Sequence, residues 1–161
     1  MSCPPRLLNI CFACWAFSMS SLFVLADQLS TLINPALGVL LLGEPLRDQQ
    51  DAREPWPRFW LRAGASVGIA VALAEWGKHS QVWQGHPNFP SGHTTLATAA
   101  ATALVLRRGP RWLCLSVPAV VLMGGSLVYG HWHTTDEVVG GLALGSAVAG
   151  VCFRFRNRPP E

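Results

Sequence analysis

Charged residues are scarce in this sequence of 161 residues. Only 13% of the residues are charged, and a single lysine, Lys78, is present; an ordinary soluble domain has about 25% charged residues. No basic patch alternates with aromatic residues, which argues against a nucleic-acid partner. Half of the residues are hydrophobic, and they fall into blocks separated by polar gaps. This pattern is typical of a membrane protein with several helical spans in the lipid bilayer.

The sequence has five cysteines, and their positions do not indicate a disulfide framework. Four of them lie in apolar blocks: Cys11, Cys14, Cys114 and Cys152. We expect them to be small buried residues rather than zinc ligands or disulfide partners.

Six apolar runs are candidates for membrane spans. They cover about residues 7–26, 29–43, 59–76, 92–106, 112–129 and 138–153. The second run is short, and we expect Asp27-Gln28 to form a turn before it. The sequence therefore predicts an all-α polytopic helical bundle, made by one membrane-embedded domain over residues 1–161.

The basic residues are distributed unevenly around these spans. Threading six spans alternately places every arginine on one side: Arg6, Arg47, Arg53, Arg58, Arg62, Arg107, Arg108, Arg111, Arg154, Arg156 and Arg158. The other side receives only Lys78 and all five histidines. By the positive-inside rule, the arginine side is cytoplasmic. We therefore expect both termini in the cytoplasm, and a multi-pass protein of the plasma (inner) membrane with its histidines on the extracytoplasmic side.

A histidine and a carboxylate stand four residues apart before the sixth run, so His133 and Glu137 share one face of a helix. A carboxylate that accepts the proton of one imidazole nitrogen makes the other nitrogen more basic. That prepares a histidine to act as a nucleophile or a general base. Asp136, three residues from His133, is open to the same role. Thr134 or Thr135 also suits the N-cap of this helix, and the two functions are compatible.

The segment Pro90-Ser91-Gly92-His93 opens the fourth run. Proline and serine both suit a helix start. A helix N-terminus that carries a glycine lets backbone N–H groups approach an anion such as phosphate. His93 would then stand beside that anion, ready to protonate a leaving oxygen. The alternative is a capped helix with an interfacial histidine.

Together the two motifs resemble the type 2 phosphatidic acid phosphatase superfamily, also called lipid phosphate phosphatases, whose site vanadium haloperoxidases share. The family pattern runs Lys-x6-Arg-Pro, then Pro-Ser-Gly-His, then Ser-Arg-x5-His-x3-Asp. Residues 90–93 match the middle motif. Ser126 stands seven residues before His133, as the family serine does before its nucleophile, and Glu137 takes the place of the family aspartate.

The sequence also departs from the family pattern. Leu127 stands where the family has an arginine, and seven residues rather than six separate Lys78 from His86-Pro87, which replaces Arg-Pro. No arginine is therefore expected at the phosphate site. Phosphate binding would depend on Lys78, on backbone amides and on protonated His86 or His131, which lack the bidentate geometry of arginine.

The resemblance implies a phosphatase that acts through a phosphohistidine and needs no metal or other cofactor. His133 would attack phosphorus, Glu137 with help from Asp136 would orient it, and His93 would protonate the leaving group. The residues expected to hold the phosphoryl oxygens are Lys78, Ser91, Gly92, His86, His131 and Ser126. The expected substrate is a lipid phosphate or a polyprenyl diphosphate, and phosphatidic acid, phosphatidylglycerol phosphate and sugar-linked polyprenyl phosphates also fit.

Three alternatives remain open at the level of sequence. His131 with Asp136 offers a second register for the nucleophile, although His133 aligns better with Ser126. A metal site is conceivable from imidazoles and a carboxylate: His131, His133, His93, His86 and Asp136. Finally, the missing arginines are compatible with a catalytically degenerate protein that binds a lipid phosphate or serves a structural role.

Overall fold

A computed structural model describes the backbone of residues 5–43 and 55–154, and the side chains of residues 21–43 and 55–154. It contains α1 (Pro5–Gly43), α2 (Trp56–His79), α3 (Gly92–Arg108), the 3-10 helix η2 (Pro110–Trp112), α4 (Leu113–Tyr129) and α5 (Thr135–Arg154). No strand occurs in these ranges, so the expected all-α class is confirmed. Helices α2 to α5 coincide with the last four expected spans to within a few residues.

The expectation of two spans at 7–26 and 29–43 is wrong. Both runs belong to α1, which continues without a break through Asp27-Gln28. The turn does not form because neither residue is a helix breaker, and the hydroxyl groups of Ser30 and Thr31 bond to the Asp27 carbonyl within the helix. With 39 residues, α1 is about 58 Å long, whereas a lipid hydrocarbon core is about 30 Å thick.

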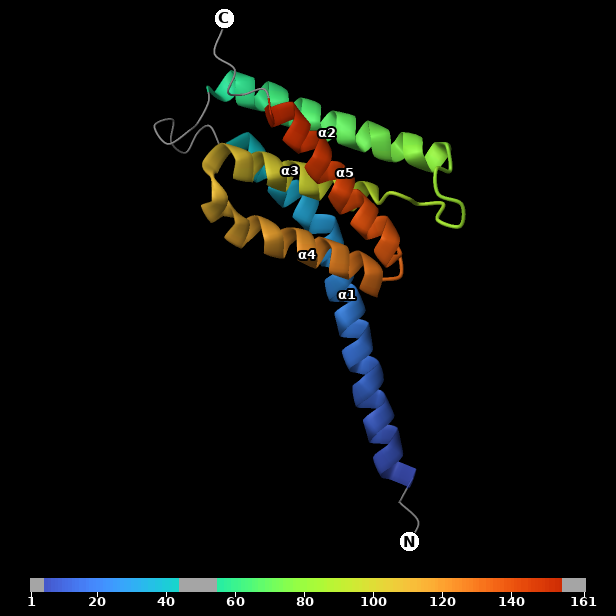
Figure 1. Cartoon of the computed structure of the whole chain (residues 1–161). Helices are drawn as coiled ribbons and strands as arrows, with labels where there is room; N and C mark the ends of the chain where they lie inside the picture. Colours follow the sequence, from blue (N-terminus) through green and yellow to red (C-terminus); the bar gives the residue numbers. More distant parts are fainter. Residues whose placement is uncertain (1–4, 44–54, 155–161) are drawn as a thin grey trace, which may run out of the picture.

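The helices run alternately between two ends of the bundle (Figure 1). At one end, which we call the histidine end, α2 and α4 finish and α3 and α5 begin. At the opposite end, which we call the arginine end, α1, α3 and α5 finish and α2 and α4 begin. The start of α1 projects beyond the histidine end, far from the end of α5 (Figure 1). The expectation that both termini lie on one side therefore loses its basis, although the terminal residues themselves are outside the described ranges.

Helices α3 and α5 pack closely because α5 presents glycines to α3. A Cβ atom at Gly141 would lie 2.7 Å from the Ser91 carbonyl oxygen, and one at Gly145 would lie 2.5 Å from the Thr95 carbonyl oxygen. Small residues allow helix backbones to approach in this way. The contact brings the first turns of α3 and α5 together, and these turns carry the two motifs identified in the sequence.

The remaining contacts form two apolar clusters. One joins α1, α3, α4 and α5 around Leu37, Leu104, Met123 and Leu127. The other lies near the arginine end, where Phe59 of α2 packs against Phe153 of α5 and the buried guanidinium of Arg107 stacks over the Phe59 ring at 4.4 Å. These clusters fix the helix ends relative to one another.

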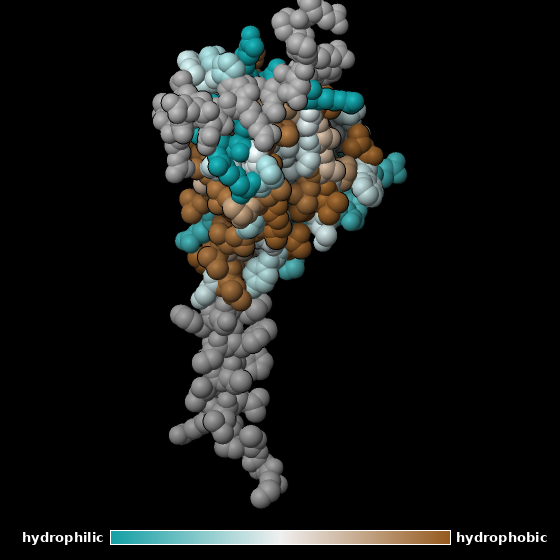
Figure 2. Space-filling view, turned by 60° about the vertical axis from the view of Figure 1, so that its left-hand side comes forward, coloured by the Kyte–Doolittle hydropathy of each residue, from teal (hydrophilic) through white to brown (hydrophobic). Residues whose placement is uncertain are grey.

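The outer surface of the bundle is strongly apolar. Large hydrophobic side chains are exposed on several helices, among them Leu32, Val39, Leu61, Val121 and Val151. Figure 2 shows such side chains across the middle of one face, with hydrophilic ones gathered mainly above. Three stretches among the described residues are long and apolar enough to cross a membrane: Ser21–Gly43, Pro110–Tyr129 and Thr135–Arg154.

Candidate active site

The first turn of α5 is closed by a reciprocal pair of hydrogen bonds. Thr134 is the N-cap, and its hydroxyl accepts from the Glu137 backbone N–H at 3.4 Å. The Glu137 carboxylate accepts from the Thr134 backbone N–H at 3.1 Å. This Thr-x-x-Glu arrangement is a capping box. It holds the Glu137 side chain, which is only 4% exposed, in a fixed place at the helix start.

The same carboxylate oxygen of Glu137 contacts His133. The His133 Nδ1 lies 2.9 Å from Glu137 Oε2, and the imidazole is 11% exposed. Because a carboxylate accepts, Nδ1 carries the proton in this contact, and in the neutral ring Nε2 keeps its lone pair. A ring so held has a defined tautomer and orientation. The predicted pairing of His133 with Glu137 is thus present in the structure.

The start of α3 lies directly beside this pair. The Ser91 backbone N–H donates to the Glu137 carbonyl oxygen at 2.9 Å, which joins the two helix starts. The Ser91 side chain is the N-cap of α3: it is fully buried and accepts from the Thr94 hydroxyl at 3.2 Å. The structure therefore places Ser91 as the residue that shapes the helix start, with its hydroxyl turned inward.

The two motif histidines face one another across this junction. The ring centroids of His93 and His133 are 6.4 Å apart, with an angle of 60° between the ring planes. His93 is exposed, whereas His133 is mostly covered. The separation is short enough for one phosphoryl group to contact both rings, which is the arrangement that a nucleophile and a general acid require.

The end of α2 brings a cation to the start of α3. Lys78 Nζ lies 3.2 Å from the position that a Cβ atom of Gly92 would occupy, so the ammonium reaches the first residue of α3. The first backbone N–H groups of a helix have no partner inside the helix and carry partial positive charge. Lys78 and the N-terminus of α3 therefore favour an anion at the same point.

The Glu75 carboxylate, which was not among the predicted site residues, also lies at the start of α3 beside Lys78. Glu75 Oε1 accepts from Lys78 Nζ at 2.6 Å and also lies 3.2 Å from the Gly92 Cβ position. From sequence, Glu75 and Lys78 are an ordinary pair spaced by three on a helix. Glu75 and Gly92 are seventeen positions apart in the sequence. The one sequence feature that could have linked Glu75 to the site is its spacing of three from Lys78.

His86 reaches the site from the loop between α2 and α3. Its Nδ1 lies 3.3 Å from the Thr134 hydroxyl oxygen, and its Nε2 lies 3.8 Å from Asp136 Oδ2. Its ring also packs against Trp83, with the ring centroids 5.3 Å apart. Asp136 therefore points toward His86 rather than His133, and Glu137 is the carboxylate that contacts His133.

Two of the predicted site residues lie apart from this cluster. The Ser126 hydroxyl donates to the Met123 carbonyl oxygen of its own helix at 2.9 Å and is buried. The His131 side chain is exposed, on a residue with φ of 58°, and does not take part in the His133–Glu137 pair. The geometry supports His133 rather than His131 as the partner of a carboxylate.

The position at which the family has an arginine is filled by apolar packing. Leu127 is 3% exposed and belongs to the cluster with Met123 and Val138. The arginine side chains that the structure describes belong to the arginine end: Arg58, Arg62, Arg107, Arg108, Arg111 and Arg154. Each of them lies in η2 or in the half of its helix nearer the arginine end, and so away from the site.

The described side chains do not form a metal site of the kind considered above. No group of three His, Cys, Asp or Glu side chains within residues 21–43 and 55–154 is arranged to hold a metal ion. The imidazoles are instead engaged in pairs, His133 with Glu137 and His86 with Asp136.

Comparison with known proteins finds similarity to two lipid phosphate phosphatases. A protein named "Lipid phosphate phosphatase 1" from Arabidopsis thaliana is 35% identical over 92 residues, covering 48% of this chain and 28% of its own length. A second, "Lipid phosphate phosphatase 2", also from Arabidopsis thaliana, is 35% identical over 98 residues, covering 52% of this chain and 34% of its own. The chain thus spans about a third of the length of these relatives, and no solved structure matches it.

The match to a family is broader than the match to either relative. Residues 52–160 match the family described as the PAP2 superfamily, and this segment contains both histidine motifs, Lys78 and the four helices α2 to α5. The matched segment is more than half of the chain. The chain is therefore a member of the PAP2 superfamily.

Proposed function

We propose that this membrane protein is a phosphatase that hydrolyses a lipid-linked phosphate or diphosphate through a phosphohistidine on His133. The observation that carries the proposal is the 2.9 Å contact of His133 Nδ1 with Glu137, made within reach of a second imidazole, His93. Membership of the PAP2 superfamily and the names of the similar Arabidopsis proteins support the same activity.

In the first step, His133 Nε2 attacks phosphorus while Glu137 holds the proton on Nδ1 and stabilises the positive ring. The bond between phosphorus and the leaving oxygen breaks, and His93 gives its proton to that oxygen. Lys78 and the backbone N–H groups at the start of α3 stabilise the charge on the other phosphoryl oxygens. The capping box keeps the nucleophile in place without reorganisation.

In the second step, neutral His93 takes a proton from water as the water oxygen attacks phosphorus. The phosphorus–nitrogen bond breaks, inorganic phosphate leaves, and His133 returns to its neutral form. No metal is needed in this scheme. The two histidines thus have different roles in this scheme. His133 is a covered nucleophile fixed by a carboxylate, and His93 is an exposed general acid and base that water can reach.

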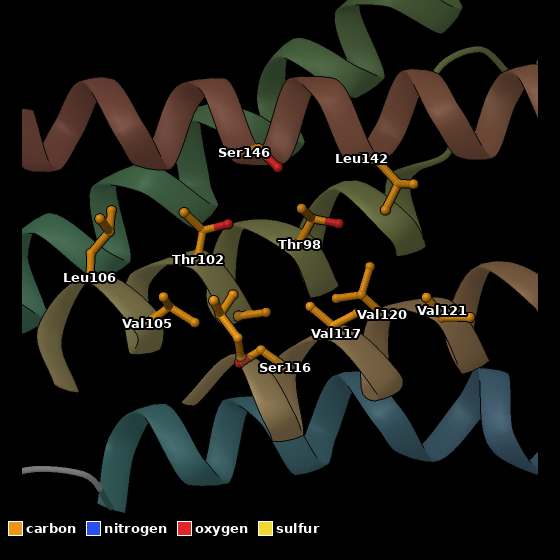
Figure 3. A pocket seen from close by; sticks show the side chains of 12 residues that line it. Thr98, Thr102, Val105, Leu106, Ser116, Val117, Val120, Val121, Leu142 and Ser146 are labelled. Carbon is orange, nitrogen blue, oxygen red and sulfur yellow. The ribbon is translucent and has the colours of Figure 1, made fainter. Parts of the chain in front are cut away.

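A groove between α3, α4 and α5 supports a lipid as substrate. It has a volume of about 520 Å³ and is lined mainly by aliphatic side chains such as Leu106, Val117 and Leu142, with a few hydroxyl groups (Figure 3). Two of its lining residues, Thr98 and Leu142, stand five positions after His93 and Glu137 in the sequence. We infer that the hydrocarbon tail of the substrate lies in this groove while its phosphate reaches the histidine end.

We further propose that the arginine end faces the cytoplasm of a plasma (inner) membrane and that the site faces outward. The support is the segregation of the described arginines and the positive-inside rule. With α1 crossing once, its first turn falls on the outer side. A reporter inserted at Gln84 should be exposed outside and one at Gly109 inside; finding both on the same side contradicts this topology.

The activity is tested by phosphate release from a panel of lipid phosphates with detergent-purified full chain. The panel should include phosphatidic acid, phosphatidylglycerol phosphate and a polyprenyl diphosphate, so that monophosphatase and diphosphatase activities separate. Turnover that is lost in His133→Ala supports the proposal. Saturable binding of these lipids without turnover by the parent would favour the alternative, a lipid-phosphate-binding protein, which the apolar residue Leu127 at the family's arginine position makes worth testing.

A further inference from the structure

The pair formed by Glu75 and Lys78 lies on the anion-binding position of the proposed active site. Both Glu75 Oε1 and Lys78 Nζ lie 3.2 Å from the Cβ position of Gly92, at the first residue of α3. The two side chains are joined by a 2.6 Å hydrogen bond. A carboxylate oxygen thus already stands where Lys78 and the start of α3 favour a negative charge.

The charges around this point are unfavourable for a second anion. Glu75 and Glu137 bring two negative charges, and Lys78 brings one positive charge. A phosphoryl group that arrives at Lys78 meets a cation whose charge Glu75 has already neutralised. It also meets the Glu75 carboxylate itself, and like charges at contact distance repel.

Glu75 is placed so that it can leave. Its side chain is 51% exposed, whereas that of Lys78 is 25% exposed, so rotation of Glu75 into water uncovers the ammonium without moving α2. Exposed ion pairs of this kind are weak, because both partners are well solvated when apart. A phosphoryl group held by Lys78, by α3 and by the two imidazoles has more partners than Glu75 has.

We propose that Glu75 is an internal competitor for the phosphoryl group, a specificity-determining carboxylate that occupies Lys78 in the free protein and swings out when a phosphoryl group binds. This inference rests on the proposed function. It assigns Glu75 two effects: weak binding of small anions that have no lipid tail, and return to Lys78 after hydrolysis, which helps to expel inorganic phosphate. A lipid substrate overcomes the competition because its tail adds binding in the groove.

The test is a calorimetric titration of the detergent-purified full chain with inorganic phosphate, which reads binding without any turnover. Glu75→Gln keeps the shape of the side chain and removes its charge. We expect it to bind phosphate about two- to fivefold more tightly than the parent, the range that corresponds to an exposed ion pair. In a Lys78→Met background, the same substitution should give a smaller gain, because there is no ammonium to release.

The matched control is Asp27→Asn, which removes one negative charge from an exposed position of α1 that does not contact the site. It should leave the affinity for phosphate at the parent value. Unchanged or weaker binding by Glu75→Gln, an equal gain in Asp27→Asn, or no phosphate binding by any variant would overturn the inference. Phosphate binding that tightens in Glu75→Gln, in a chain without turnover of any lipid phosphate, would retain the internal competitor and reject the phosphatase.

Discussion

The histidine end and the arginine end of this helical bundle are built from the same helices, but they differ in the charged and titratable residues that they carry. The histidine end gathers all five histidines, the only lysine and three of the described carboxylates, Glu75, Asp136 and Glu137. The arginine end gathers the described arginines at the start of α2, in η2 and at the ends of α3 and α5. Permanent cations alone therefore do not define the candidate site, since the end richer in arginines does not carry the His133–Glu137 pair.

What distinguishes the histidine end is the way its polar groups are held. Glu137 is fixed by the capping box and in turn fixes His133, and Ser91 ties the start of α3 to the Glu137 backbone. The starts of α3 and α5, which carry the two motifs, are thus tied together. At the arginine end, the Arg107 guanidinium stacks over the Phe59 ring and so contributes to the packing of the bundle.

The largest expected effect concerns the apolar residue that stands at the family's arginine position, near the histidine end. Leu127→Arg restores the family's residue type but puts a guanidinium into the cluster with Met123 and Val138. Burial of an unpaired charge should destabilise the fold by about 3 kcal/mol or more, which a thermal unfolding assay in detergent will measure. Leu127→Met, which conserves volume, should change stability by less than about 1.5 kcal/mol. A stable Leu127→Arg protein with higher activity would show that the histidine end accepts the family's arginine after all.

The next effect compares matched charge removals at the two ends. Glu137→Gln still accepts the His133 proton but loses the charge that stabilises the positive ring, so kcat should fall by about a hundredfold or more. Arg111→Gln, on the exposed 3-10 helix of the arginine end, should keep kcat within about twofold, since it lies in no contact with the proposed reaction. Equal losses in the two variants would remove the functional distinction between the ends.

A third comparison uses two glycines of α5. Gly145→Ala places a methyl group 2.5 Å from the Thr95 carbonyl oxygen, so α3 and α5 must move apart. We expect a loss of about 1–3 kcal/mol in stability and a fall in kcat, because the separation also strains the bond from Ser91 to Glu137. Gly150→Ala, near the arginine end, has no atom within 4 Å of its Cβ and should be neutral or slightly stabilising. A neutral Gly145→Ala would contradict the close packing that joins the two motifs.

The smallest effect distinguishes the two neighbouring carboxylates. Asp136 is 61% exposed and lies 3.8 Å from His86 rather than near His133. Asp136→Asn should therefore change KM by only a few fold, in keeping with a weak exposed ion pair, and leave kcat nearly as it is. Steady-state kinetics beside Glu137→Gln will measure this contrast. A hundredfold loss of kcat in Asp136→Asn would return Asp136 to the orienting role first considered for it.

The sequence could predict much of this arrangement where the signal is local. Apolar runs located α2 to α5, and the spacing of four between His133 and Glu137 predicted a contact that the structure contains. The expected turn at Asp27-Gln28 was wrong because one charged residue on an exposed helix face does not interrupt a helix. The predictions of six spans and of both termini on one side both depended on that turn, and without it they have no support.

Signals that depend on long-range contacts were not available from the sequence. The spacing of Ser126 from His133 pointed to the phosphate site, but its hydroxyl bonds to its own helix. Asp136 was expected to help Glu137 orient His133, but in the structure Asp136 lies by His86, and the capping box holds Glu137 beside His133. Glu75 was not among the predicted site residues, because only the fold brings it next to Gly92.

The central claim is that His133 carries the phosphoryl group during turnover. The most direct measurement is to mix the full chain with a radiolabelled lipid phosphate, quench within milliseconds in alkaline denaturant, and locate the label by mass spectrometry. The account predicts phosphate on His133 in the parent, its accumulation in His93→Ala when the leaving group is already good, and no label in His133→Ala. Phosphate on any other residue, or label that persists in His133→Ala, would contradict it.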